Sequence, residues 1–132
     1  MKTTSKGTLT IIMDRNNNPR VLFEPINGTV WLRKAELPSL FGARVQTIQT
    51  CLNSILKEGV IDVEKTCKYE LYVRGNRVRY DVREVNLEVI IAMAFGIRSP
   101  QAEALRGWFI QRCLYPGISN HLPDMERRAD WN

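Results

Sequence analysis

The feature that most constrains the fold is a predicted β-hairpin in the middle of the chain. Residues 66–74 and 77–83 are rich in β-branched and aromatic side chains, and the two-residue loop Gly75-Asn76 joins them. A loop of this length fixes which residues face each other across the two strands. The predicted pairs are Arg74 with Arg77, Val73 with Val78, Tyr72 with Arg79, Leu71 with Tyr80, Glu70 with Asp81, and Tyr69 with Val82.

The two faces of this hairpin differ in character. One face is apolar, and we expect it to pack on the helices of the domain; it consists of Tyr69, Leu71, Val73, Val78, Tyr80 and Val82. The other face presents Arg74, Arg77, Arg79 and Tyr72 toward the tip, with Lys68 and Arg83 near the base. Opposed arginines repel each other, and a polyanion would reverse the sign of that interaction. The tip arginines are therefore predicted to contact phosphates or the minor groove of DNA. The alternative is an edge hairpin charged to resist aggregation.

Two predicted helices with a tight break between them precede the hairpin. Residues 34–41 indicate a short helix, in which Pro38 is tolerated only if the helix starts late. Gly42-Ala43 provides the break. Residues 44–57 indicate a second helix, with Val45, Ile48, Leu52 and Ile55 at helical spacing on its buried side. This order is the outline of a helix-turn-helix.

The second helix has an outward face without a carboxylate. Five amide and hydroxyl side chains form it, and Arg44 and Lys57 lie near its ends; the five are Gln46, Thr47, Gln49, Thr50 and Asn53. The amides can pair bidentately with an adenine edge, and the threonine hydroxyls can bond to a base or a phosphate. These five residues are therefore predicted to read bases. The predicted DNA-backbone contacts are Arg44, Lys57, Lys68, Arg74, Arg77 and Arg79. The alternative is an ordinary polar surface helix, although such helices more often mix Glu with Lys.

The remaining elements complete the predicted domain. Residues 8–13 and 20–25 indicate an opening β-hairpin. Residues 87–95 are apolar nearly all round, so we expect them to form the buried central helix, capped by Asn86. Ser99-Pro100 begins a last helix, and Pro116-Gly117 ends it.

Length and composition favour one globular domain. The chain has 132 residues, 44% apolar and 25% charged, which argues against a disordered or fibrous protein. We assign residues 1–115 to the domain and residues 116–132 to a C-terminal tail. The net charge of +5 favours a polyanionic partner. No apolar stretch is long enough to cross a bilayer and no signal-peptide pattern is present, so a cytoplasmic protein without membrane contact is expected.

The residue patterns that catalysis or metal binding would need are missing. The three cysteines, Cys51, Cys67 and Cys113, lack the spacing of a zinc site or a disulfide framework. The one histidine, His121, lies in the tail, and Cys67 is expected to be a buried small side chain rather than a nucleophile. No phosphate-binding glycine loop and no carboxylate cluster occur. We therefore expect no enzymatic activity, no cofactor, no metal and no small-molecule ligand.

Several motifs, taken in order, resemble the N-terminal region of virulence RhuM-family proteins over roughly residues 8–115. They are Trp31-Leu32, Ala35-Glu36-Leu37, Leu40-Phe41-Gly42, Ile48, Ile55, Glu58-Gly59-Val60-Ile61, Thr66-Cys67-Lys68, Tyr80, Asn86-Leu87, Val89-Ile90-Ile91, Phe95-Gly96-Ile97-Arg98-Ser99 and Arg106-Gly107-Trp108. The resemblance implies DNA recognition and transcriptional control, of the kind found in antirepressor-type modules of phages. The chain departs from the family at Pro38, at Ala43, which offers no capping oxygen, and at the Pro116-Gly117 break.

Together these features predict an α+β domain of winged helix-turn-helix character, with an N-terminal β-hairpin, a basic β-ribbon wing and two C-terminal helices. Residues 44–57 would enter a major groove, and the ribbon of residues 68–83 would hold the adjacent backbone. We expect a sequence-specific protein that binds double-stranded DNA, and a homodimer on two half-sites is compatible with it. The alternative is a protein-interaction adaptor, antitoxin-like or phage-associated, whose basic ribbon binds an acidic partner.

Overall fold

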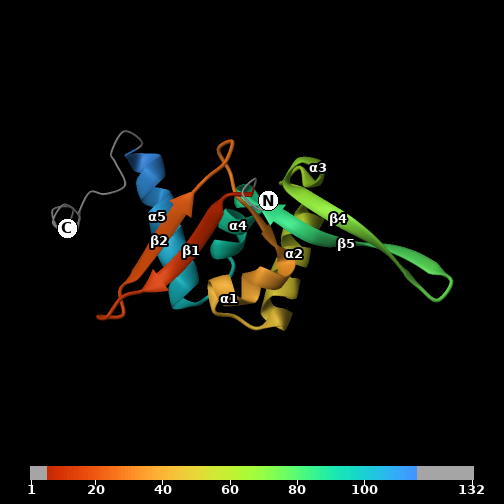
Figure 1. Ribbon diagram of the computed structural model, residues 1–132, viewed down its shortest axis with the longest axis horizontal. Coiled ribbons are helices and arrows are strands. Elements are labelled where there is room, and N and C mark those ends of the chain that lie inside the picture. Colours follow the sequence, from red (N-terminus) through yellow and green to blue (C-terminus); the bar gives the residue numbers. More distant parts are fainter. Residues whose placement is uncertain (1–5, 116–132) are drawn as a thin grey trace.

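The opening β-hairpin forms within one residue of its predicted bounds. The computed structural model describes residues 6–115, in which β1 (Thr8–Met13) pairs antiparallel with β2 (Pro19–Glu24) (Figure 1). The Phe23 ring of β2 meets the Trp108 ring edge-on, with centroids 5.0 Å apart. Trp108 belongs to the last helix, α5 (Pro100–Leu114), so the hairpin packs against that helix.

The first helix of the predicted pair is short and starts late. Lys34–Glu36 form a 3₁₀ turn, η2, and α1 covers only Leu37–Phe41. Pro38 therefore lies in the first turn of α1, where a backbone N–H would have no helical partner, as predicted. Gly42 ends α1 in the left-handed conformation, with φ of 61°.

The second helix, α2, runs over Val45–Glu58 and ends at Gly59, which is also left-handed. Ile48 and Leu52 are buried on its inner side, as predicted. The prediction that Val45 shares this buried side is wrong, because Val45 is 70% exposed at the first turn of the helix.

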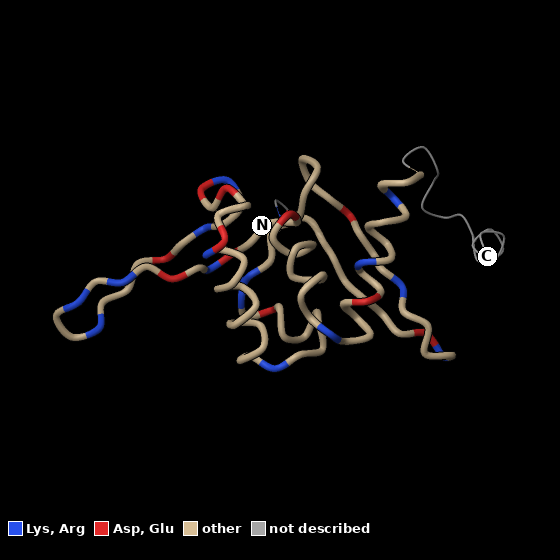
Figure 2. The backbone as a smooth tube through the Cα atoms, turned by 180° about the vertical axis from the view of Figure 1, so that it is seen from behind, with Lys and Arg blue, Asp and Glu red and all other residues tan. Residues whose placement is uncertain are grey.

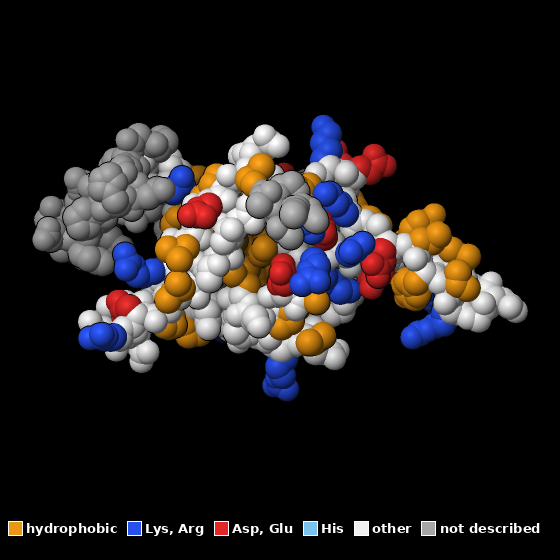
Figure 3. Space-filling model, in the orientation of Figure 1, with side chains coloured by type: hydrophobic (Ala, Val, Ile, Leu, Met, Phe, Trp, Pro, Cys, Tyr) orange, Lys and Arg blue, Asp and Glu red, His pale blue; other side chains and the backbone are white. Residues whose placement is uncertain are grey.

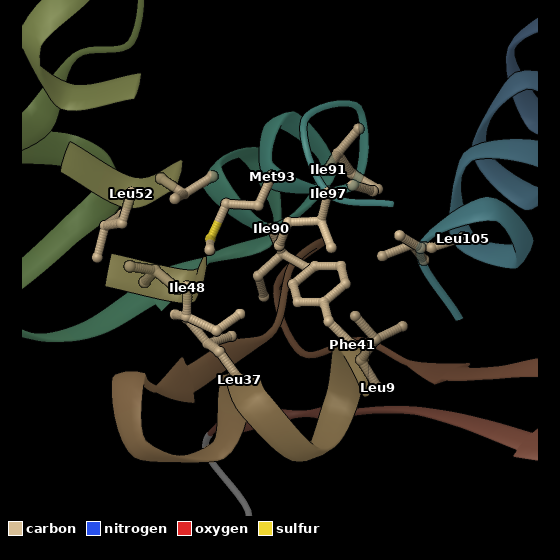
Figure 4. Close-up of a cluster of buried hydrophobic side chains, with 14 of the residues drawn as sticks. Leu9, Leu37, Phe41, Ile48, Leu52, Ile90, Ile91, Met93, Ile97 and Leu105 are labelled. Atoms are coloured by element: carbon tan, nitrogen blue, oxygen red, sulfur yellow. The ribbon is translucent and has the colours of Figure 1, made fainter. Parts of the chain in front are cut away.

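The core is centred on α4 (Leu87–Ala94), as the apolar run predicts. Asn86 caps this helix, and its Oδ1 accepts from the backbone N–H groups of Glu88 and Val89. Ile90 and Met93 are fully buried and lie among side chains from α1, α2 and α5 (Figure 4). The α4 helix thus holds the opening hairpin, the helix pair and α5 around one core.

A three-stranded antiparallel sheet carries the predicted central hairpin. Its strand order is β3-β5-β4, with β3 at Trp31–Arg33, β4 at Cys67–Arg74 and β5 at Arg77–Asn86. All six predicted cross-strand pairs are confirmed, from Arg74 with Arg77 to Tyr69 with Val82. Sequence patterns missed strand β3 and the one-turn helix α3 (Val63–Thr66), because each is too short to show a period.

The distal part of the β4–β5 ribbon projects from the body of the domain (Figure 1). Strand β3 pairs only with residues 84–86 of β5, so the ribbon has two strands beyond its base. Every residue from 68 to 80 is exposed. The prediction that the apolar face of the hairpin packs on helices is therefore wrong, except at Val82, which is 8% exposed. Alternation along a strand groups residues on one face, but it does not specify what covers that face.

Candidate nucleic-acid interface

The outward face of α2 is open to solvent. Four of the five predicted base-reading residues are exposed, namely Gln46, Thr47, Thr50 and Asn53, while Gln49 is half-buried. The first turn of α2 holds no acidic residue. Arg44, and not Ala43, occupies the N-cap position, and its side chain makes no capping hydrogen bond. Arg44 and Lys57, at the two ends of the helix, are both exposed.

Lys34 joins this face of α2 to the base of the ribbon. Its Nζ donates to Oε1 of Gln49 at 2.9 Å and lies 3.2 Å from Oδ1 of Asp81. Lys34 belongs to η2, Gln49 to α2 and Asp81 to β5, so one side chain connects three elements. Sequence reasoning missed Lys34, because its partners lie 15 and 47 positions away along the chain.

Gln49 in turn orients Asn53. The Nε2 group of Gln49 donates to Oδ1 of Asn53 at 3.0 Å, one helical turn further on. Because an amide accepts at its oxygen, this bond directs the Asn53 oxygen toward Gln49 and sets the rotation of the exposed amide group. Thr47 lies two positions before Gln49, about 200° around the helix, and so on the flank away from the ribbon.

The arginine face of the ribbon is linked to α2 through Lys34, at the base of the ribbon. Arg77, Arg79 and Asp81 alternate with apolar residues along β5 and therefore share one face. Since Lys34 contacts both Asp81 and Gln49, the base of that face lies near the polar face of α2. Arg77 lies four positions before Asp81 on β5, so the tip reaches about 13 Å beyond this contact.

The charges on the ribbon are sorted along its length. Near the base, Arg83 lies 3.7 Å from Glu70, and Asp81 meets Lys34. Within residues 6–115, none of the salt bridges involves Arg74, Arg77 or Arg79, and the tip carries positive charge alone (Figure 2). The structure thus brings these three arginines to one exposed, uncompensated tip.

Lys68, near the base of the ribbon, has partners that the sequence did not predict. The register shifts between the pairs Tyr69 with Val82 and Lys68 with Glu84, so Arg83 of β5 is the extra residue of a β-bulge and Lys68 faces Glu84 across the strands. Its Nζ lies 3.8 Å from Oε1 of Glu84 and 4.5 Å from the centre of the Trp31 ring. The register of the ribbon would place Lys68 opposite Arg83, and the bulge places it opposite Glu84 instead.

Glu84 is a buried carboxylate at the junction of the three strands. Burial by itself raises the pKa of this carboxyl group, but a hydrogen bond and the charge of Lys6, with the charges of Lys68 and Arg83, lower the pKa below its usual range. The group therefore stays ionised and fixes the base of the ribbon to the N-terminal segment.

Cys67 and Arg106, which the sequence also singled out, are engaged in the packing of the fold. Cys67 is buried as expected, and burial raises the pKa of its thiol, which favours the unreactive protonated form. Arg106 Nη1 donates to the carbonyl groups of Ala94 at 2.7 Å and Ile97 at 3.1 Å, tying α5 to α4. In the part of the chain that the structure describes, no group of three or more His, Cys, Asp or Glu side chains could hold a metal ion. His121 and the predicted tail lie outside the described residues.

No helix between residues 6 and 115 has both the length and the apolar character needed to cross a bilayer. No protein-family model, curated protein or solved structure matches the chain. The resemblance to the RhuM family therefore stays a prediction.

Proposed function

We propose that this chain is a sequence-specific double-stranded DNA-binding domain of the winged helix-turn-helix type. In this proposal α2 enters the major groove, and the β4–β5 ribbon contacts the adjacent backbone. The observation that carries it is the double contact of Lys34, since this residue joins Gln49 on α2 to Asp81 on the arginine face of the ribbon. A role as a transcriptional regulator or antirepressor-like factor rests on the RhuM resemblance.

In this proposal the part of α2 nearest the ribbon recognises the bases. The major groove, about 12 Å wide, admits an α-helix, and Asn or Gln can accept from N6 and donate to N7 of adenine. Asn53 is exposed and already oriented by Gln49, so less conformational freedom is lost when it binds a base. Gln46 and Thr50 extend the same polar surface. Thr47, on the far flank, has the weakest support among the five.

In this proposal cations at three places around that surface contact the DNA backbone. Arg44 and Lys57 lie at the two ends of α2, and Arg74 and Arg77 at the ribbon tip lie about 13 Å beyond Asp81. Each contact with a phosphate releases condensed counterions, which makes binding depend on salt concentration. Lys68 is the least suited to this role, because Glu84 and Trp31 already engage its ammonium group.

A salt titration with two matched double variants tests backbone contact. Arg74 and Arg77 flank the turn of the ribbon, while Arg15 and Arg20 flank the turn of the opening hairpin, on the other flank of the molecule (Figure 1). Replacing either pair with Ala removes the same charge. The ribbon pair should make the slope of log affinity against log salt shallower by about 1.8, at about 0.9 per contact. The hairpin pair should leave the slope almost unchanged, and equal effects would contradict the proposal.

Selection of bound sequences from a random duplex pool tests base recognition. The wild-type chain should enrich a motif, and Asn53→Ala should lose preference at one position, a discrimination of about 1–3 kcal/mol per bidentate pair. Ser54→Ala, also exposed on α2, is the control and should keep the motif. The alternative, an adaptor for an acidic protein, uses the arginines but has no need of the Asn53 amide. A pool without enrichment, together with a flat salt response, would favour that alternative.

A further inference from the structure

The face of the ribbon opposite the arginines is an uncovered apolar surface. Five of its side chains are between 44% and 71% exposed, and they are Tyr69, Leu71, Val73, Val78 and Tyr80. Cross-strand pairing places Leu71 beside Tyr80 and Val73 beside Val78, so the five are contiguous. Figure 3 shows hydrophobic side chains gathered along the projecting ribbon. We call these five residues the ribbon patch.

The ribbon patch is as large as the largest apolar patch on a typical monomer, and such patches are often functional. The exposed fractions correspond to roughly 600 Å², at the upper end of the about 300–600 Å² that the largest patch on a monomer usually covers. Single exposed apolar residues are common and need no explanation, but five adjacent ones on a projecting element do. The patch therefore indicates a contact surface.

The ribbon also lacks the support that a β-hairpin normally needs. An isolated two-stranded hairpin is at best marginally stable in water, and stability usually requires a third strand or packing against another element. Strand β3 supports only the base, opposite residues 84–86. Covering the ribbon patch would supply the missing packing for residues 69–80.

The chemistry of the patch restricts what can cover it. The patch itself carries no charge, while the arginines lie on the opposite face and point away from it. A nucleic acid, an anionic membrane or an acidic protein would find no complementary cation there. An apolar surface of the same size and shape is what fits.

We propose that the ribbon patch binds the ribbon patch of a second copy of this chain. Two such faces would remove at most roughly 1,200 Å² from water, which reaches the lower limit for a specific interface of about 1,200–2,000 Å². The contact is isologous, so it closes on two copies and leaves no patch exposed. It also leaves the arginine face and α2 accessible, and it holds whether or not the chain binds DNA.

Mass measurement in solution without DNA tests this contact. At micromolar concentrations the chain should sediment at twice its 15.2 kDa mass. Leu71→Glu should reduce that mass to one chain, because it places a charge in the apolar contact. Tyr72→Glu is the matched control, since Tyr72 is adjacent on β4, lies opposite Arg79 on the arginine face, and should keep the dimer. Tyr80→Glu should repeat the effect of Leu71→Glu from the other strand.

Several results would overturn the proposal. The first is a wild-type monomer at the same concentrations, and the second is a dimer that survives Leu71→Glu. The third is a dimer that dissociates in high salt. An apolar contact between two chains of charge +5 should instead strengthen, because salt screens their repulsion. A monomer whose patch binds only vesicles or another protein would also overturn it. Thermal unfolding of each variant separates loss of the contact from loss of the fold. Because no DNA is present, failure here leaves the DNA proposal standing, and the reverse also holds.

Discussion

Lys34 shows how much of the candidate site depends on a single side chain. Its ammonium group is shared between the Gln49 amide and the Asp81 carboxylate, and its side chain is 23% exposed. Gln49 then orients Asn53. None of this follows from the sequence, because the three elements involved meet only through the tertiary fold. The sequence did identify Gln49 and Asn53 as outward-facing, since helical spacing alone decides that.

Replacing Lys34 with Met keeps the apolar stem and removes the charge. We expect the free energy of unfolding to fall by about 1 kcal/mol, because one hydrogen bond to a charged group and one partly exposed ion pair are lost. We also expect a less sharp sequence preference, because Gln49 and Asn53 lose their fixed orientation. Urea unfolding measures the first effect and pool selection the second. Lys65→Met, at an exposed position on α3, should change neither, and an unchanged motif in Lys34→Met would refute the positioning role.

Glu84 gives the fold a dependence on acid pH. Burial acts to raise the pKa of its carboxyl group, but the hydrogen bond and charge of Lys6, with Lys68 and Arg83, lower it overall in the folded chain. A lowered pKa contributes stability above the unfolded value, about 4.3, and this contribution is lost as the pH falls through the folded pKa. Glu84→Gln should therefore flatten the acid side of the curve of unfolding free energy against pH. The exposed Glu24→Gln should retain the wild-type curve, and equal flattening by both would show that Glu84 is not the group responsible.

At the scale of elements, local chemistry decides what the sequence can predict. The Gly75-Asn76 loop specifies the register of β4 and β5, and the caps Asn86 and Ser99 specify where α4 and α5 begin. The late start of α1 follows from Pro38. Strand β3 escapes prediction because its three residues are defined only by pairing with β5. The bulge at Arg83 escapes prediction for the same reason, and it gives Lys68 a carboxylate partner that the sequence did not show.

Two glycines in helical regions should respond to substitution in opposite directions. Gly42 has a φ of 61°, and an added Cβ would lie 2.7 Å from the Gln101 side chain. Gly42→Ala should cost about 1–2 kcal/mol from the left-handed backbone alone. Gly107 lies inside α5, and a Cβ added there would meet no atom within 4 Å outside its own helical turn. Gly107→Ala should therefore stabilise the fold by about 0.5–1 kcal/mol. Thermal or urea unfolding of both variants checks the signs, and a stabilising Gly42→Ala would contradict the role of Gly42 as the end of α1.

At the scale of the whole molecule, the projecting ribbon separates two surfaces of opposite character. Alternation in the sequence correctly assigns the arginines to one face and the apolar residues to the other. It does not reveal that the apolar face lies beyond the body of the domain, because that depends on how far β3 and the helices extend along the ribbon. The side-by-side placement of the α2 face and the arginine face likewise needed the fold. A sequence pattern therefore defines surfaces, while tertiary structure decides which of them are left uncovered.

The two proposals together have a consequence for how a dimer would meet DNA. If two ribbons stack through their patches, the two arginine faces form the outer surfaces of the stack and point in opposite directions. Each arginine face adjoins its own α2, so one dimer should hold two separate duplexes rather than two half-sites on one duplex. Capture of a fluorescent duplex by an immobilised one, through the wild-type chain, measures this bridging. Leu71→Glu should still bind a single duplex but lose the bridging. A wild-type dimer that saturates at one duplex would exclude this arrangement of the two DNA-binding faces.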